Sequence, residues 1–185
     1  MAVKPRSRKL HTMTMTALMA VVLCVLSPVA IPVGPVPVTL CTLLLYLAAC
    51  LLGWRAAAMS ALVYVLLGMA GMPVFQGFTG GLGCVLGPTG GYIIGYVPMT
   101  ALCGLAAERF SGRVALRALG FAAATVVLYA LGTAWFCVQA GKGLGPALAL
   151  CVFPFLPGDI AKLAAVLSVG PMVRRNLEKA GLLDV

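Results

Sequence analysis

Two opposite charges, Asp159 and Lys162, stand three residues apart in the apolar stretch PFLPGDIAK, residues 154–162. Pro157 and Gly158 favour the start of a helix at this point. Asp159 then lies in the first turn, where the positive end of the helix dipole favours an anion, and Lys162 follows on the same helix face. The two side chains offer one acceptor and one donor to a small solute. The alternative is a structural pair whose charges cancel.

Further polar side chains occur in and just after the connection that ends near residue 90. The run GPT, residues 87–89, predicts a loop that enters a helix, and Thr89 and Tyr92 then face the same way near its entrance. Gln76, and with it Thr79, lies in the same connection. Because small-molecule sites are usually apolar pockets with a few convergent polar groups, we expect a compact, partly apolar solute. The predicted binding residues are Gln76, Gly87, Thr89, Tyr92, Asp159 and Lys162.

The composition indicates which elements must hold these residues. Of the 185 residues, 62% are hydrophobic and 9% are charged, and the mean hydropathy is +1.09. Soluble domains carry about a quarter charged residues, so this chain has too little polar surface to cover a water-exposed globule. The composition therefore predicts an all-α integral membrane protein. The net charge of +9 does not indicate nucleic-acid binding, because the basic residues fall in short clusters between apolar segments.

We expect a single membrane domain over residues 1–185 with six transmembrane helices. A span needs about 20 apolar residues, and fewer where tilt or neighbouring helices help. The first segment is interpreted as an uncleaved helix rather than a signal peptide, because five more apolar segments follow it. The predicted segments are about 12–27, 38–53, 55–71, 88–107, 115–138 and 157–173.

The positions of the basic residues predict the orientation of these helices. Eleven of the 13 Lys and Arg residues fall in the termini and connections on one side. Lys142 is the single basic residue in the opposite connections, and Lys162 lies inside the sixth segment. Since basic residues concentrate on the cytoplasmic side of membrane proteins, we expect both termini to be cytoplasmic.

Two connections on the outer side, 28–37 and 72–87, are apolar and rich in proline or glycine. Irregular backbone near membrane depth is tolerated where it is buried in protein or lines a cavity. We therefore expect these connections to cover or wall an outward-facing cavity. The glycines of 77–95 do not form the dinucleotide-binding motif, which needs a preceding strand. Gly91 and Gly95 are instead expected to let another helix approach closely.

Several classes of activity are disfavoured by the residues that the chain contains. Its seven cysteines show no CxxC spacing and its one histidine is His11, so we expect no metal site. No Walker A motif is present, and no cysteine has a positioned base beside it. We therefore predict a binding subunit without a cofactor, not an enzyme, which draws energy from partner proteins.

The first segment carries small residues every fourth position, at Thr12, Thr16, Ala20 and Cys24. Such a stripe lets helices approach closely. We predict a docking surface for a partner at Thr16, Ala20 and Cys24, and the alternative is packing within this chain.

Together these features resemble a known family, the BioY family, the biotin-specific S components of energy-coupling factor transporters. The resemblance covers nearly the whole chain. It is carried by IPVGPVPVTL (31–40), GMPVFQGFTGGLG (71–83), GPTGGYIIGY (87–96) and PFLPGDIAK (154–162).

The resemblance implies a six-helix protein of the bacterial cytoplasmic membrane that captures biotin from outside. It implies association with a transmembrane coupling protein and two cytoplasmic ATPases, and it places Asp159 and Lys162 in the biotin site. Biotin would close the outer connections over itself before the loaded protein reorients. The alternatives are a stand-alone oligomeric biotin carrier without ATPases, a membrane enzyme, and a structural subunit without a ligand.

Overall fold

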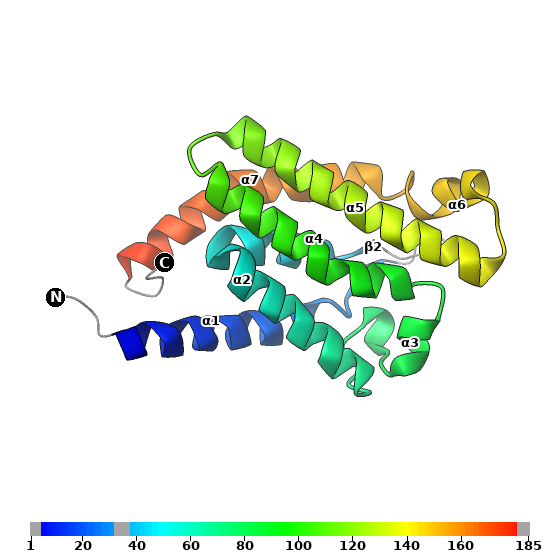
Figure 1. The fold of residues 1–185 in the computed structure, drawn as a ribbon, viewed down its shortest axis with the longest axis horizontal. Helices are drawn as coiled ribbons and strands as arrows, with labels where there is room; N and C mark the ends of the chain where they lie inside the picture. The colour runs from blue at the N-terminus through cyan, green and yellow to red at the C-terminus, as the bar shows by residue number, and fades with distance from the viewer. Residues whose placement is uncertain (1–4, 32–37, 181–185) are drawn as a thin grey trace.

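The computed structural model describes residues 5–31 and 38–180, which form a bundle of α-helices (Figure 1). In the described part, the short strands β1 (Ala30–Ile31) and β2 (Val38–Thr39) pair antiparallel, and a 3-10 helix, η1, covers Gln76–Phe78. The helices are α1 (Pro5–Leu26), α2 (Cys41–Met69), α3 (Leu82–Leu86), α4 (Gly90–Arg109), α5 (Val114–Ala140), α6 (Leu144–Cys151) and α7 (Leu156–Lys179).

Five of these helices, α1, α2, α4, α5 and α7, are long and apolar enough to cross a membrane. α2 contains two of the predicted segments, 38–53 and 55–71. As a straight helix, its 29 residues would extend roughly 44 Å, well beyond a hydrocarbon core of about 30 Å. The helix is interrupted instead at Gly53, which has φ 77° and ψ 177°. Thr42 in the first half of α2 and Tyr64 in the second half line the same cavity. The chain therefore turns back at Gly53, and the two halves run in opposite directions.

The interruption in α2 is held by a carboxylate from α4. The backbone N–H of Trp54 donates to Oε1 of Glu108 at 2.9 Å, which satisfies one of the free N–H groups at the start of the second half of α2. A Cβ atom at Gly53 would collide with the same carboxylate. Gly104 of α4 lets the backbone of Trp54 approach closely. The sequence predicted two helices here, and the structure shows a turn with a single non-helical residue between them.

Glycine also sets the contact between α4 and α5. A Cβ at Gly91 would lie 2.8 Å from the carbonyl oxygen of Leu131, and one at Gly95 would lie 2.8 Å from Cδ1 of Leu128. Both distances are too short for a side chain. The packing role predicted for these two glycines is therefore what the structure shows.

The helices at both ends of the chain extend beyond the predicted spans. α1 begins at Pro5 and α7 continues to Lys179, whereas the predicted spans begin near residue 12 and end near 173. Lys and Arg are good helix formers, so each helix continues past its apolar part. α6 was not predicted as a helix. Proline is tolerated in the first turn of a helix, and Pro146 stands in the first turn of α6.

The bundle has two ends of different character (Figure 1). One end, here the cavity end, holds the β1–β2 pair, η1, α3 and α6. The other, here the basic end, holds the turn at Gly53, the α4–α5 connection, the start of α1 and the end of α7. Of the connection 28–37, residues 32–37 lie outside the described part of the chain.

Candidate ligand-binding site

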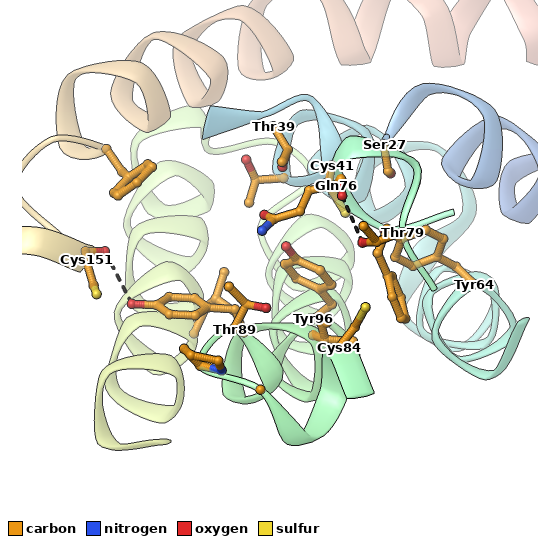
Figure 2. Close-up of a pocket in the computed structure, with 18 of the residues that line it drawn as sticks. Ser27, Thr39, Cys41, Tyr64, Gln76, Thr79, Cys84, Thr89, Tyr96 and Cys151 are labelled. Atoms are coloured by element: carbon orange, nitrogen blue, oxygen red, sulfur yellow. Dashed lines mark hydrogen bonds between the residues drawn. The ribbon is translucent and has the colours of Figure 1, made fainter. Parts of the chain in front are cut away.

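A cavity of about 210 Å³ opens at the cavity end. Its wall is formed by α2, α4, α5 and α7, together with η1 and α3 from the connection 72–87 (Figure 2). The rings of Tyr64, Phe75, Tyr96 and Phe155 supply much of the apolar surface. The structure brings all of the predicted binding residues to this one wall: Gln76, Gly87, Thr89, Tyr92, Asp159 and Lys162, with Thr79 beside them.

Asp159 and Lys162 form a buried ion pair at the edge of the cavity. Lys162 Nζ lies 3.0 Å from Oδ1 of Asp159, and the two side chains are 14% and 11% exposed, with lysine the first of these values. The ammonium group also donates to the carbonyl oxygen of Thr39 at 2.8 Å and to Oγ1 of Thr42 at 2.9 Å. All three donors of the ammonium group therefore have acceptors, which keeps this charge in place within an apolar wall.

The carboxylate of Asp159 is held equally closely. Tyr129 Oη donates to Oδ2 at 2.5 Å, and Thr42 Oγ1 donates to Oδ1 at 3.2 Å. Thr42 therefore accepts from the lysine and donates to the aspartate. Such charge-assisted networks are strong and fix their members in one geometry. The arrangement presents a rigid dipole to the cavity, with a carboxylate and an ammonium group at fixed positions.

The hydroxyl of Tyr92 is hydrogen-bonded within the protein and is not free for a ligand. Its hydroxyl donates to the carbonyl oxygen of Cys151 at 3.3 Å, the bond drawn to the labelled Cys151 in Figure 2, and lies 3.3 Å from Oγ1 of Thr133. Its ring lies so close to Gly132 that a Cβ there would collide with it. The hydroxyl thus ties α4 to α5 and α6, and the ring is left to line the cavity.

Other polar groups on the wall are free to meet a ligand. In the described part of the chain, neither the Gln76 carboxamide nor the Thr89 hydroxyl makes a hydrogen bond. Figure 2 shows the Gln76 carboxamide and the Tyr96 hydroxyl pointing towards the same part of the cavity. The hydroxyl of Ser27, with a residue exposure of 1%, also lines the cavity and has no partner of hydrogen-bonding geometry among the described residues.

Thr42 and Tyr129 were missed by the sequence analysis. Thr42 lies among leucines, and nothing in its local sequence indicates a partner more than a hundred residues away. Tyr129 had a usable signal, because Thr125, Tyr129 and Thr133 recur at every fourth position of an otherwise apolar helix and so lie on one face. Each of the three bonds to a different helix, α2, α7 and α4 respectively.

Among the described residues, no three His, Cys, Asp or Glu side chains lie close enough together to hold a metal ion. All seven cysteines are free thiols. At the end of α6, burial raises the pKa of the Cys151 thiol, which keeps it protonated and weakly nucleophilic at neutral pH.

The small-residue stripe of the first segment lies against α2. Ala20 is 2% exposed, and the carbonyl oxygen of Thr16 accepts a hydrogen bond from Ser60 of α2 at 2.9 Å. Cys24 is half-buried. This arrangement corresponds to the alternative of packing within the chain, and Ala20 is not available to a partner in this structure. The exposed side of α1 carries larger apolar residues, Leu18, Val21 and Val25.

The fold and the cavity together define a helical membrane protein with a mostly apolar cavity at one end of its bundle. Residues 2–179 match the BioY family, and the chain belongs to that family. It is 34% identical over 168 residues to a probable biotin transporter BioY of Pyrococcus horikoshii, covering 91% of this chain and 99% of the relative. It is 35% identical over 174 residues to the biotin transporter BioY2 of Lactococcus lactis subsp. cremoris, covering 93% and 94%.

The fold is also similar to a solved structure. The crystal structure at 2.1 Å of the S-component for biotin from an ECF-type ABC transporter superposes with a TM-score of 0.85. The match covers 94% of this chain and 95% of the other, at 25% sequence identity.

Proposed function

We propose that this chain captures biotin in the cavity as the S component of an energy-coupling factor transporter, and so serves ATP-driven biotin uptake. The observation that carries the proposal is the buried Asp159–Lys162 pair in the wall of an otherwise apolar cavity. Membership of the BioY family supports it. The protein is a transporter subunit rather than an enzyme.

The cavity and biotin are chemically complementary. Biotin has an apolar thioether ring, ureido N–H donors, a ureido oxygen and a carboxylate tail. The carboxylate of Asp159 can accept from a ureido N–H at Oδ2, which has one protein donor, Tyr129. The three N–H groups of Lys162 are bonded within the protein, so this residue holds the carboxylate in place and its positive charge attracts an anionic group of the ligand. Gln76 and Thr89 supply further hydrogen bonds, and the aromatic rings of the wall cover the apolar part. A hydrogen bond to a charged group is worth about 1.5–3 kcal/mol, so Asp159 contributes strongly to affinity, and Lys162 contributes by keeping Asp159 charged and in place.

The proposed topology has six spans with both termini cytoplasmic. It is supported by the interruption at Gly53, which lets each half of α2 cross separately, and by the basic residues gathered at the end that holds both terminal helices. The cavity end then faces outside, where biotin arrives. The basic end faces the cytoplasm, where a coupling protein and two ATPases would associate.

Closure over the ligand is assigned to the connection 72–87. Its backbone is anchored at two points, where Gly77 N–H donates to Pro28 O at 2.9 Å and Gly81 N–H donates to Gly68 O at 2.7 Å. Thr79 lies between these anchors and Gln76 directly precedes the first of them, and both residues line the cavity. Biotin binding should protect this connection from limited proteolysis, and equal cleavage with and without biotin would contradict closure.

The function is tested by equilibrium binding of radiolabelled biotin to the purified chain in detergent. The parent should bind tightly, whereas Asp159→Asn and Lys162→Ala should each lose about ten- to a hundredfold in affinity. Lys142→Ala, which removes an exposed basic residue from the cavity end, is the matched control and should bind like the parent. A folded parent that does not bind biotin would overturn the proposal, and unchanged affinity in both pair variants would make the ion pair structural.

Association with the partner subunits needs a separate test. Co-expression with a coupling protein and its ATPases should yield a complex that co-purifies on a tag placed on this chain. Biotin uptake by this chain in cells that lack those subunits would favour the stand-alone carrier instead.

A further inference from the structure

Arg117 is a buried cation near the start of α5, at the basic end. It is 8% exposed, and its Nε atom is enclosed without a hydrogen-bond partner among the described residues. A guanidinium group carries five N–H donors and remains charged at any physiological pH. Burying such a charge is costly unless an anion or several acceptors meet it. The residual exposure shows that the side chain is not sealed from the surface of the bundle.

The described part of the chain offers Arg117 no carboxylate. The sequence contains only four acidic residues, and one of them, Asp184, lies outside the described residues. The other three each have another partner: Asp159 pairs with Lys162 in the cavity, Glu108 accepts at the turn of α2, and Glu178 pairs with Nε of Arg174 at 2.9 Å.

A second guanidinium group converges on the same place from α7. Arg174 Nη1 donates to the carbonyl oxygen of Cys50 at 3.3 Å, and both Arg117 and Arg174 lie close enough to the Cys50 thiol to act on it electrostatically. Gly170 makes this approach feasible, because a Cβ there would already lie 3.3 Å from Cβ of Cys50. Two positive charges from different helices therefore flank one point on α2.

We infer that Arg117 and Arg174 form a binding site for the phosphate group of an acidic phospholipid in the leaflet at the basic end. The planar guanidinium fork matches phosphate oxygens in a bidentate geometry. Basic pockets between transmembrane helices near the cytoplasmic surface are suited to anionic headgroups. α5 and α7 contact each other little, so a headgroup can approach Arg117 between them from the lipid side.

The neighbouring side chains suit the acyl chains of the same lipid. Exposed apolar residues stand within about two turns of each arginine along α5 and α7: Val114, Leu119, Val169 and Met172. A lipid held here would join α2, α5 and α7 at the end opposite the biotin cavity. The inference does not rest on the proposed function, since it concerns neither the cavity nor its ligand.

The test measures thermal unfolding of the full chain, purified in a non-ionic detergent, during titration with short-chain phosphatidylglycerol, phosphatidylcholine or inorganic phosphate. Phosphatidylglycerol should raise the Tm of the parent, because a ligand that binds only the folded state stabilises it by mass action. In Arg117→Gln and Arg174→Gln, the apparent affinity for this lipid should fall by about tenfold or more. Arg175→Gln, one residue further along α7 and exposed, is the matched control and should retain the parent's response.

Arg117→Gln also gives a readout that separates lipid binding from a structural role. Without acidic lipid its Tm should equal or exceed that of the parent, because an unpaired buried charge has been removed; with phosphatidylglycerol the parent should be the more stable. A lower Tm for Arg117→Gln under both conditions would overturn the inference, because it would show a counterion within the chain. So would equal stabilisation of the parent by phosphatidylcholine, and a response to inorganic phosphate as strong as that to the lipid would identify a free-anion site instead.

Discussion

The two ends of the bundle treat charged side chains in opposite ways. At the cavity end, Asp159 and Lys162 neutralise each other, and hydroxyl and carbonyl groups make further hydrogen bonds to both. At the basic end, Arg117 is buried without a carboxylate in the described part of the chain, and the Arg174–Glu178 pair is 29% and 44% exposed, respectively. The protein supplies its own counter-charge where a ligand site must be rigid. At the other end Arg117 has no internal counter-charge among the described residues, where we propose that an external phosphate group binds.

The largest effect is expected when one member of the buried pair is removed. Asp159→Ala leaves the Lys162 ammonium group enclosed with a surplus charge, and should destabilise the fold by about 3 kcal/mol. The measurement is the free energy of unfolding of the purified chain in mixed micelles. Lys142 is exposed and has no ion-pair partner among the described residues, so Lys142→Ala should stay within about 0.5 kcal/mol of the parent. A similarly small loss for Asp159→Ala would show that the cavity end does not depend on the pair.

A second substitution tests the turn that brings the two halves of α2 back to the cavity. Gly53→Ala would place a side chain at a residue with positive φ and push its Cβ against the Glu108 carboxylate. The free energy of unfolding should fall by roughly 2 kcal/mol. Gly112→Ala, in the α4–α5 connection, has open space around its Cβ and is the matched control. Equal thermal stability of the two variants would contradict the account of the turn.

Removal of a single tyrosine hydroxyl compares a hydrogen bond to a charged group with a neutral one. Tyr129→Phe deletes a hydrogen bond to the charged Asp159, whereas Tyr46→Phe deletes a neutral one to Thr125. Bonds to charged groups are worth about 1.5–3 kcal/mol and neutral ones about 1 kcal/mol, so Tyr129→Phe should be the more destabilising of the two. It should also weaken biotin binding, because the carboxylate loses one of its anchors. A larger effect from Tyr46→Phe would mean that the charge of Asp159 adds little.

The smallest effect is expected at the exposed ion pair of α7. Glu178→Gln should change stability by less than about 0.5 kcal/mol, and the change should vanish in high salt. A large, salt-resistant loss would show that the basic end also depends on internal ion pairing.

The sequence was sufficient to predict the features that depend on local pattern. Asp159 and Lys162 could be placed together because a spacing of three on a helix leaves little choice of geometry. The packing of Gly91 and Gly95 followed from their spacing in the same way. The break at Gly53 was predicted only as a boundary between apolar segments, since the carboxylate that holds it comes from a helix far along the chain.

What could not be predicted depends on contacts between distant segments. Thr42 gave no local sign of its role, and Arg117 was counted with the basic residues of a connection although it lies buried within α5. The side of α1 that meets α2 was left open, because a small-residue stripe serves an internal contact and an external one equally well. Each of these depends on which helices become neighbours, which a single helix does not reveal.

We propose that Asp159 and Lys162 act as one unit in binding biotin. The most direct measurement is a double-mutant cycle of biotin affinity with Asp159→Asn, Lys162→Ala and the double variant. We expect strong coupling between the two residues, so that the double variant loses little more affinity than either single variant. Losses that simply add, or a double variant that binds like the parent, would contradict it.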